Sequence, residues 1–224
     1  MKKLSYLFLV FTLLIVSCNE RNVIIPDINF KNALLSSNYV DTDGDGKGDA
    51  TIDLNGDNEI QINEIESVKF LNVSSKNIES LEGIEGFVNL EKLDCHDNQL
   101  KNLDVVNNKE LVTLYCYDNQ IENLDLIANK KLKVLGCRGN LLTSLNLSKN
   151  SNLEVLYGYN NRLTSLNLKN GNNSKMRAMF AHGNEYLKCI EVDDMDAIYP
   201  SSDVENYKGW CKDDYASYVE SCDN

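Results

Sequence analysis

Apolar residues recur every 21 residues through the middle of the chain. The repeated pattern is L-x-x-L-x-C-x-x-N, and a second apolar trio follows it, as in Leu100, Leu103 and Val105. The first copy is atypical, and the last is degenerate and follows a two-residue insertion. The copies begin at Val68, Leu90, Leu111, Leu132, Leu153 and Met176.

This pattern predicts a stack of coils with a parallel sheet along one side. The L-x-C segment has a period of two, which is typical of a strand, and strands at a fixed repeat form a parallel sheet. Six apolar positions per coil cannot be buried by one coil alone, whereas stacked coils bury them in one continuous core. The remaining residues are too few for a helix of three turns, so we expect the opposite side to be extended or 3₁₀. The Asn column, which includes Asn98 and Asn119, is expected to bond backbone groups of neighbouring turns.

The period, the leucines and the Asn position resemble the leucine-rich repeat family over about residues 68–190. The resemblance implies a repeat solenoid with short parallel β-strands on its concave face and an extended or 3₁₀ convex side. Open ends of such a stack need polar covers, so we divide the mature chain into a cap at 26–67, repeats at 68–188 and a second cap at 189–224. Pro26 and Asp27 precede a predicted amphipathic helix with Phe30, Ala33 and Leu34 on its apolar face.

The chain has seven cysteines, which fall into three groups. One is Cys18, near the N-terminus. A second group shares one inward column with small residues of later copies, and we interpret its members as unreacted core thiols: Cys95, Cys116 and Cys137. The third group lies in the tail, where at most one bridge can form among its three members: Cys189, Cys211 and Cys222.

Both ends of the mature chain resemble secreted leucine-rich proteins of Bacteroidota. The similar segments are Ile25–Leu34 at the start, and the tail that runs from Cys189 through Trp210 to Cys222. This resemblance implies a Cys189–Cys222 disulfide. Cys211 departs from the pattern, so which of the three cysteines stays free is left open.

The N-terminus predicts export. Lys2 and Lys3 precede an apolar run that is too short to span a bilayer and suits a signal peptide, assigned to residues 1–17. The run ends in Ile15-Val16-Ser17-Cys18, which resembles a bacterial lipobox and implies cleavage before Cys18 and acylation of that residue. Residues 18–25 are then a lipidated linker, and the protein is anchored to the outer membrane on its periplasmic or cell-surface side. The alternative is an ordinary signal peptide with an incidental cysteine.

Acidic residues are concentrated at the two ends of the mature chain. The net charge is −12. Residues 41–66 and residues 191–224 each carry −8, and the rest of the chain carries +4. A phosphate backbone would be repelled, so nucleic acid is not an expected partner. A dense acidic block is either a solvated loop or a site neutralised by a cation.

Residues 53–64 resemble an EF-hand calcium loop. The resemblance implies oxygen ligands for Ca²⁺, with Glu59 acting through its carbonyl and Glu64 through both carboxylate oxygens. Asn58 stands where Gly is usual, and Asn tolerates a left-handed φ better than most residues. The implied ligands are Asp53, Asn55, Asp57, Glu59, Gln61 and Glu64. The alternative is an acidic loop with no fixed ion.

The preceding stretch resembles a thrombospondin type 3 calcium repeat, in which the closing acid comes one residue late. The resemblance implies a second ion and leaves open whether one or two ions bind. The matching residues are Asp41, Asp43, Asp45 and Asp49. Calcium is expected to fix the N-terminal cap.

Large side chains alternate with the inward residues of the repeats, so they point outward from the predicted sheet. One outward column contains Tyr115, Tyr157 and Phe180, and the next contains the residues His96, Tyr117, Arg138, Tyr159 and His182. We expect Arg138 to stack on Tyr117 or Tyr159, or to meet an anionic group. Outward tyrosines favour a binding surface for a protein or a glycan ligand, and the alternative is stacking that only protects the sheet.

An enzyme is not expected. His96 and His182 are four strands apart, about 19 Å at roughly 4.8 Å per strand, so they cannot share a zinc ion or act together as acid and base. No Ser-His-Asp spacing, phosphate loop or H-E-x-x-H occurs. We therefore expect a monomeric, membrane-anchored binding module; a purely structural envelope protein is the alternative.

Overall fold

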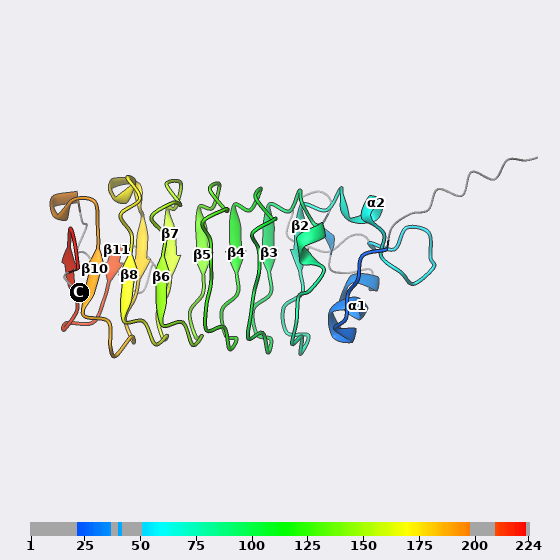
Figure 1. Ribbon diagram of the computed structural model, residues 1–224, viewed down its shortest axis with the longest axis horizontal. Coiled ribbons are helices and arrows are strands. Elements are labelled where there is room, and N and C mark those ends of the chain that lie inside the picture. The colour runs from blue at the N-terminus through cyan, green and yellow to red at the C-terminus, as the bar shows by residue number, and fades with distance from the viewer. Residues whose placement is uncertain (1–21, 37–39, 42–50, 198–208, 223–224) are drawn as a thin grey trace, which may run out of the picture.

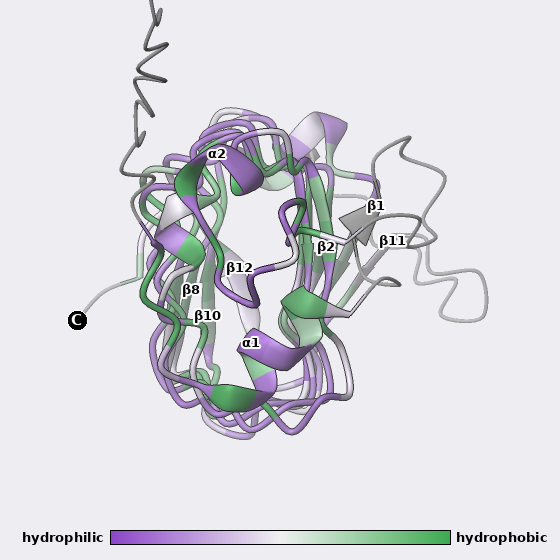
Figure 2. Ribbon diagram, turned by 90° about the vertical axis from the view of Figure 1, so that its right-hand side faces the viewer, coloured by the Kyte–Doolittle hydropathy of each residue, from purple (hydrophilic) through white to green (hydrophobic). Residues whose placement is uncertain are grey.

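The computed structural model describes residues 22–36, 40–41, 51–197 and 209–222. Successive coils lie side by side in chain order, with the first helices at one end and the C-terminus at the other (Figure 1). Seen along the stack, each coil is a flattened loop with two long sides, and strands lie on both of them (Figure 2). The predicted solenoid is therefore confirmed.

The larger sheet has the strand order β1-β2-β3-β4-β5-β7-β9-β11. All neighbours in it pair in parallel except β1 and β2, which are antiparallel. The register joins equivalent positions of successive copies, for example Leu93 with Leu114 and Leu114 with Leu135. The strands are β1 Val40–Asp41, β2 Phe70–Asn72, β3 Lys92–Asp94, β4 Thr113–Tyr115, β5 Val134–Gly136, β7 Val155–Tyr157, β9 Ala178–Phe180 and β11 Gly209–Cys211.

A smaller parallel sheet lies on the other long side, in the order β12-β10-β8-β6. Its strands are β6 Ser144–Asn146, β8 Ser165–Asn167, β10 Cys189–Glu191 and β12 Ser217–Val219. Three 3₁₀ segments are also described: η1 Ile84–Gly86, η2 Asn173–Lys175 and η3 Met195–Ala197. The convex side is thus extended or 3₁₀, as the short coils require.

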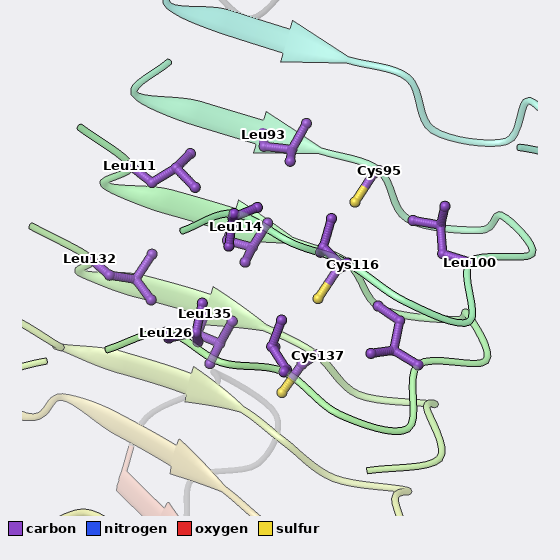
Figure 3. Packing of buried hydrophobic residues seen from close by; sticks show 14 of the residues in the cluster. Leu93, Cys95, Leu100, Leu111, Leu114, Cys116, Leu126, Leu132, Leu135 and Cys137 are labelled. Carbon is purple, nitrogen blue, oxygen red and sulfur yellow. The ribbon is translucent and has the colours of Figure 1, made fainter. Parts of the chain in front are cut away.

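Columns of leucine and cysteine fill the space between the two sides (Figure 3). Cys95, Cys116 and Cys137 lie one above another, are fully buried and are not bridged. Burial raises the pKa of all three thiols, that of Cys137 to about 12. Since the thiolate is the reactive form, these cysteines act as small apolar residues, as predicted.

The predicted Asn column is a ladder of hydrogen bonds. The Asn119 amide donates to the carbonyls of Cys95 and Cys116 at 3.0 and 3.1 Å, and its Oδ1 accepts from the Leu100 N–H at 3.0 Å. Equivalent bonds are made by the other members, Asn98, Asn140, Asn161 and Asn184. The column joins neighbouring coils through their backbone.

A second Asn ladder, which the sequence analysis missed, lies on the other side of the core. The Asn129 amide donates to the carbonyls of Val105 and Asn108, both at 2.9 Å. Asn108 and Asn150 do the same one coil away on either side. All three are completely buried, and among the described residues their Oδ1 atoms have no donor.

The N-terminal cap is a helix docked on the first coil. Helix α1, Ile28–Leu35, buries Phe30, Ala33 and Leu34, as predicted. One oxygen of Asp27 caps it by accepting from two N–H groups of its first turn, and the other accepts from the Glu79 and Ser80 N–H groups at 2.8 and 2.9 Å. A short second helix, α2, spans Ile62–Ile65.

The tail continues the solenoid and is closed by a disulfide. Both sheets extend past residue 188, where the sequence analysis placed the end of the repeats, because β10 pairs with β8 and β11 pairs with β9. Trp210 points into the core, and its indole N–H donates to the Met176 carbonyl at 3.2 Å. The Cys189–Cys222 bridge is present, as the resemblance implied, and Cys211 is free. No helix among the described residues is long and apolar enough to cross a membrane.

Candidate functional site: the concave tyrosine face

The strand register brings the predicted outward residues together on the larger sheet. Tyr115 pairs with Asp94 on one side and with Gly136 on the other, and Gly136 pairs with Tyr157. Phe180 follows in the same column. The inward leucines lie between these positions, so the predicted alternation of faces is confirmed.

The second outward column forms a stack of planar groups. His96 stacks on Tyr117 with centroids 4.3 Å apart, and Tyr159 stacks on His182 at 4.8 Å. Between these two pairs, the Arg138 guanidinium lies 4.4 Å from the Tyr117 centroid and 5.7 Å from that of Tyr159. Each ring restrains the next, so the stack is rigid before any ligand arrives.

One carboxylate–histidine contact and one ion pair hold the polar groups of this face. The Asp94 carboxylate lies 2.6 Å from Nδ1 of His96, and a carboxylate oxygen of Asp118 lies 2.9 Å from an Arg138 nitrogen. Arg138 therefore stacks on Tyr117, as expected, and its charge is paired within the chain with Asp118. Because these charges are only partly exposed, they are screened less than free surface charges.

Gly136 makes room for a tyrosine ring. A Cβ atom at this position would lie 2.8 Å from Cδ1 of Tyr115, closer than non-bonded carbons approach. The Tyr115 ring therefore lies over the bare backbone of Gly136. Its plane is turned 67° from that of Tyr117, so Tyr115 meets the neighbouring stack edge to face and is not part of it.

These side chains enclose an open cavity of about 340 Å³. The described residues that line it are Asp94, Tyr115, Tyr117, Arg138, Tyr157 and Tyr159. Burial, followed by Tyr157 and then by the Asp94 charge, raises the pKa of Tyr115, and burial followed by Asp94 does the same for Tyr117. Both phenols are therefore protonated near neutral pH and can donate hydrogen bonds. Asp94 and Gly136 share the outward column of Tyr115 and Tyr157 but are not among the predicted site residues.

The C-terminal part of the same face is buried. Phe180 points outward as predicted but is 1% exposed, and Val155 and Ala178 beside it are also buried. His182 lies at this end, and its Nδ1 is buried without a partner among the described residues. Phe180 is therefore not part of the accessible face, whereas His182 and the central tyrosines are partly exposed.

The predicted calcium loop is closed by its own hydrogen bonds. Asp53 accepts from the N–H groups of the three residues that begin at Gly56, and Asn58 has the left-handed φ, 63°, that its position suggested. The Gln61 amide donates to both oxygens of Asp57 at 3.3 and 3.0 Å. The backbone N–H of Glu59 contributes most to lowering the pKa of Asp57.

The two glutamates of the loop make structural contacts. The Glu64 oxygens accept from the N–H groups of Leu54 and Gln61, each at 2.8 Å, which begins α2. The Glu59 side chain forms an ion pair with Lys31 of α1 at 2.8 Å. Asn55 bonds both Asp57 and Gln61, so the oxygen-bearing side chains lie close together.

Some predicted residues cannot be placed. Cys18, Asp43, Asp45 and Asp49 lie outside the described residues, and only the backbone of Asp41 is described, in β1. Among the side chains that are described, no group of three or more His, Cys, Asp and Glu residues is arranged to hold a metal ion.

In comparisons of sequence, no protein-family model and no curated protein matches the chain. Among solved structures, it is similar to the functional domain of InlJ from Listeria monocytogenes, described as including a cysteine ladder. The TM-score is 0.58 at 24% identity, over 75% of this chain and 36% of that one, so this chain spans only about a third of the InlJ domain.

Two further solved structures are less similar. The leucine-rich repeat ectodomain of the receptor kinase SOBIR1 from Arabidopsis thaliana gives a TM-score of 0.48 at 24% identity, over 57% of this chain and 73% of that one. A leucine-rich repeat protein from Leptospira interrogans gives 0.40 at 23%, over 59% and 38%. Together with its own repeat geometry and its ladder of buried cysteines, the likeness to InlJ shows that this chain has the fold of a leucine-rich repeat solenoid.

Proposed function

We propose that this chain is a binding module of the cell envelope that takes a protein or glycan ligand on its concave face. The observation that carries the proposal is the open cavity of about 340 Å³ lined by four tyrosines, Arg138 and Asp94. Tyrosine and arginine dominate binding energy at protein interfaces because they offer large, stiff contact areas with polar tips. Stacking and ion pairing already fix these side chains, so binding costs little conformational entropy.

The double variant Tyr117→Ala, Tyr159→Ala tests this proposal. Both rings point away from the leucine core, so we expect the folded state to be retained while ligand binding falls at least thirtyfold, since a binding hot spot is worth about 2 kcal/mol or more. The readout is retention on a glycan array and on a displayed peptide library. Tyr186→Ala, which removes a tyrosine that is 59% exposed elsewhere, is the matched control.

The competing function is a structural one, in which the stack only shields the sheet. It is favoured by the unbroken row of contacts from His96 to His182. If that is its role, the double variant lowers the melting temperature and leaves every interaction of the protein unchanged. The binding proposal then fails.

We also propose that the protein is exported and anchored to the outer membrane through acylated Cys18. The support is the sequence before that residue, whose apolar run and Ser17 match a lipobox. Metabolic labelling with an alkyne fatty acid tests this idea, with Cys18→Ser expected to abolish the label. Equal labelling of both proteins contradicts it.

Calcium is proposed to stabilise the N-terminal cap. The oxygen donors of Asp53, Asn55, Asp57 and Glu64 lie on one hydrogen-bonded loop, and oxygen donors are what Ca²⁺ prefers. Within the described part of the chain, each carboxylate oxygen of Glu64 accepts one N–H, which leaves it a lone pair for a cation. When bound, the ion supplies charge neutralisation to the acidic loop. Glu66→Gln, at an exposed neighbouring carboxylate, is the control for variants of Glu64.

A further inference from the structure

We propose that the concave cavity binds a neutral saccharide ring, stacked on Tyr115; this rests on the proposed function and narrows its ligand class. The Tyr115 ring lines the cavity and occupies the space that a Cβ atom of Gly136 would take. Its plane is turned 67° from that of Tyr117, so the lining combines an aromatic ring that does not stack on its neighbour with the polar ends of Asp94 and Arg138. A pyranose has the complementary form, with a face of C–H groups and a rim of hydroxyls.

The cavity presents both hydrogen-bond acceptors and hydrogen-bond donors. Asp94 uses one carboxylate oxygen on His96, and its Oδ2 has no partner among the described residues. Arg138 bonds Asp118 through one terminal nitrogen, so Nε and the other terminal nitrogen have no acceptor in the described part of the chain. A sugar hydroxyl donates one hydrogen bond and accepts up to two, so one ring can satisfy the Asp94 acceptor and the Arg138 donors together.

The charges of the cavity favour a neutral ligand. The Arg138 cation is matched by Asp118 at 2.9 Å, and the Asp94 anion lies 2.6 Å from His96. An anionic ligand would meet two carboxylates at this site, and a cationic ligand would meet the guanidinium. A charged ligand would therefore compete with the Asp118–Arg138 ion pair or with the Asp94–His96 contact, whereas sugar hydroxyls can bond the donors and acceptors that these contacts leave over.

The lining also disfavours the apolar anchor of a protein partner. Every described side chain that lines the cavity ends in a polar group, and none is aliphatic. A leucine or valine inserted here would take water from Asp94 and Arg138 without replacing its hydrogen bonds, and burying polar groups in that way is costly. Two aliphatic residues on the outward face of this sheet, Val134 and Val155, lie in the column next to the cavity lining. They are partly and fully buried, respectively.

The test measures binding of the purified full-length protein to an array of neutral, sialylated and sulfated oligosaccharides. We expect retention on neutral chains, weakened at least tenfold in Tyr115→Ala. Gly136→Val should weaken it similarly, because its side chain would displace the Tyr115 ring. Tyr115→Phe, which keeps the ring face, should bind within threefold of wild type, and Tyr186→Ala should be unchanged. Circular dichroism melting confirms that each variant is folded.

Three results would overturn the inference. They are the absence of retention on any neutral chain, retention only on sialylated or sulfated chains, and neutral binding that Tyr115→Ala does not weaken. If the protein binds no oligosaccharide on the array but the double variant Tyr117→Ala, Tyr159→Ala abolishes binding to a displayed peptide, the proposed function stands. Only the proposal of a saccharide ligand is then refuted. If neither library gives binding that depends on these tyrosines, both proposals fail.

Discussion

Replacing Asn119 by Ala should destabilise the protein much more than replacing Asn129 by Ala, although both amides are buried between coils. The Asn129 amide donates its two N–H bonds to two backbone carbonyls, and the Asn119 amide donates to two in the same way and shares one hydrogen with the Tyr117 carbonyl at 3.3 Å. In every case the carbonyl keeps a second donor: for example, Val105 O still accepts from the Asn108 N–H. Each substitution therefore removes two hydrogen bonds worth about 0.5–1.5 kcal/mol each, or about 1–3 kcal/mol in total.

The two sites differ in what happens at Oδ1. Asn119 Oδ1 accepts the Leu100 N–H, which is buried and has no other acceptor among the described residues, so its loss adds about 1–3 kcal/mol. Asn129 Oδ1 is buried without a donor in the described part of the chain, so its removal relieves a similar penalty. The cavity left by the side chain is common to both variants. The expected free energy of unfolding is thus lower for Asn119→Ala by about 2–6 kcal/mol relative to Asn129→Ala.

Urea denaturation measures this difference, followed by far-UV circular dichroism and by Trp210 fluorescence. Coincident transitions with unchanged slope mean that a shift in midpoint reports stability. Equal costs at the two sites, or a larger cost for Asn129→Ala, would refute the reasoning. That result means that Asn129 Oδ1 is hydrogen-bonded in solution, for example to a buried water.

Three other changes have calculable outcomes. Although burial alone would raise it, the four N–H donors to Asp27 together lower its pKa, so this group stabilises the fold above its unfolded pKa of about 3.9 and loses that contribution as pH falls through the lower folded value. Asp27→Asn should therefore cost about 0.5–2 kcal/mol at pH 7 and flatten the dependence of stability on pH below about 4, measured by thermal melts; an unchanged pH profile contradicts this. Millimolar Ca²⁺ should add roughly 0.4–1.4 kcal/mol per site if Kd is about 10⁻⁴–10⁻³ M, and Glu64→Gln should remove the shift in melting temperature; no shift on chelation in wild type excludes the site. Replacing both Cys189 and Cys222 by Ser opens a bridge with a sequence separation of 33 and should cost roughly 3–4 kcal/mol in urea, whereas Cys211→Ser should cost little; non-reducing peptide maps that link Cys211 would contradict the assignment.

Most of the fold was predictable from the sequence because the inward apolar positions must recur at the same place in every coil of the stack. Leu93, Leu114 and Leu135 must occupy the same position in successive coils, and the register of the sheet pairs them in that order. The same regularity fixed the outward columns, since a strand alternates its faces. The second Asn ladder was not predicted, although Asn108 and Asn129 share the same 21-residue spacing. The prediction covered only the Asn of the L-x-x-L-x-C-x-x-N segment, and these residues lie outside it.

The two-residue insertion before Met176 hid the continuation of that ladder. Beyond Asn150, the role of the next Asn is taken by Asn170, which donates to the Asn150 carbonyl at 3.1 Å. Asn173 then bonds the Leu168 carbonyl and accepts from the Asp193 N–H. No period reveals such a substitution, because it depends on how the inserted loop folds back on the coil.

The candidate site was predicted in its position but not in its form. The period identifies Tyr115 and Gly136 as neighbours, but only the side-chain packing shows that one lies over the other. The Arg138–Asp118 pair likewise joins residues of adjacent coils that belong to different columns of the repeat. Such contacts depend on rotamers, which a periodic pattern does not determine.

Departures from the repeat on the outward face are therefore the most informative part of this sequence. Inward positions are alike from coil to coil because the stack cannot be built otherwise, so their similarity reports folding. Outward positions escape that constraint, and the copy that differs most from its neighbours carries Gly136 between two tyrosines and Arg138 between two others. Gly136 leaves space for the Tyr115 ring, and Arg138 packs between the Tyr117 and Tyr159 rings. Since neither change improves the core, their occurrence together in a single coil of this face is what the proposed binding function predicts.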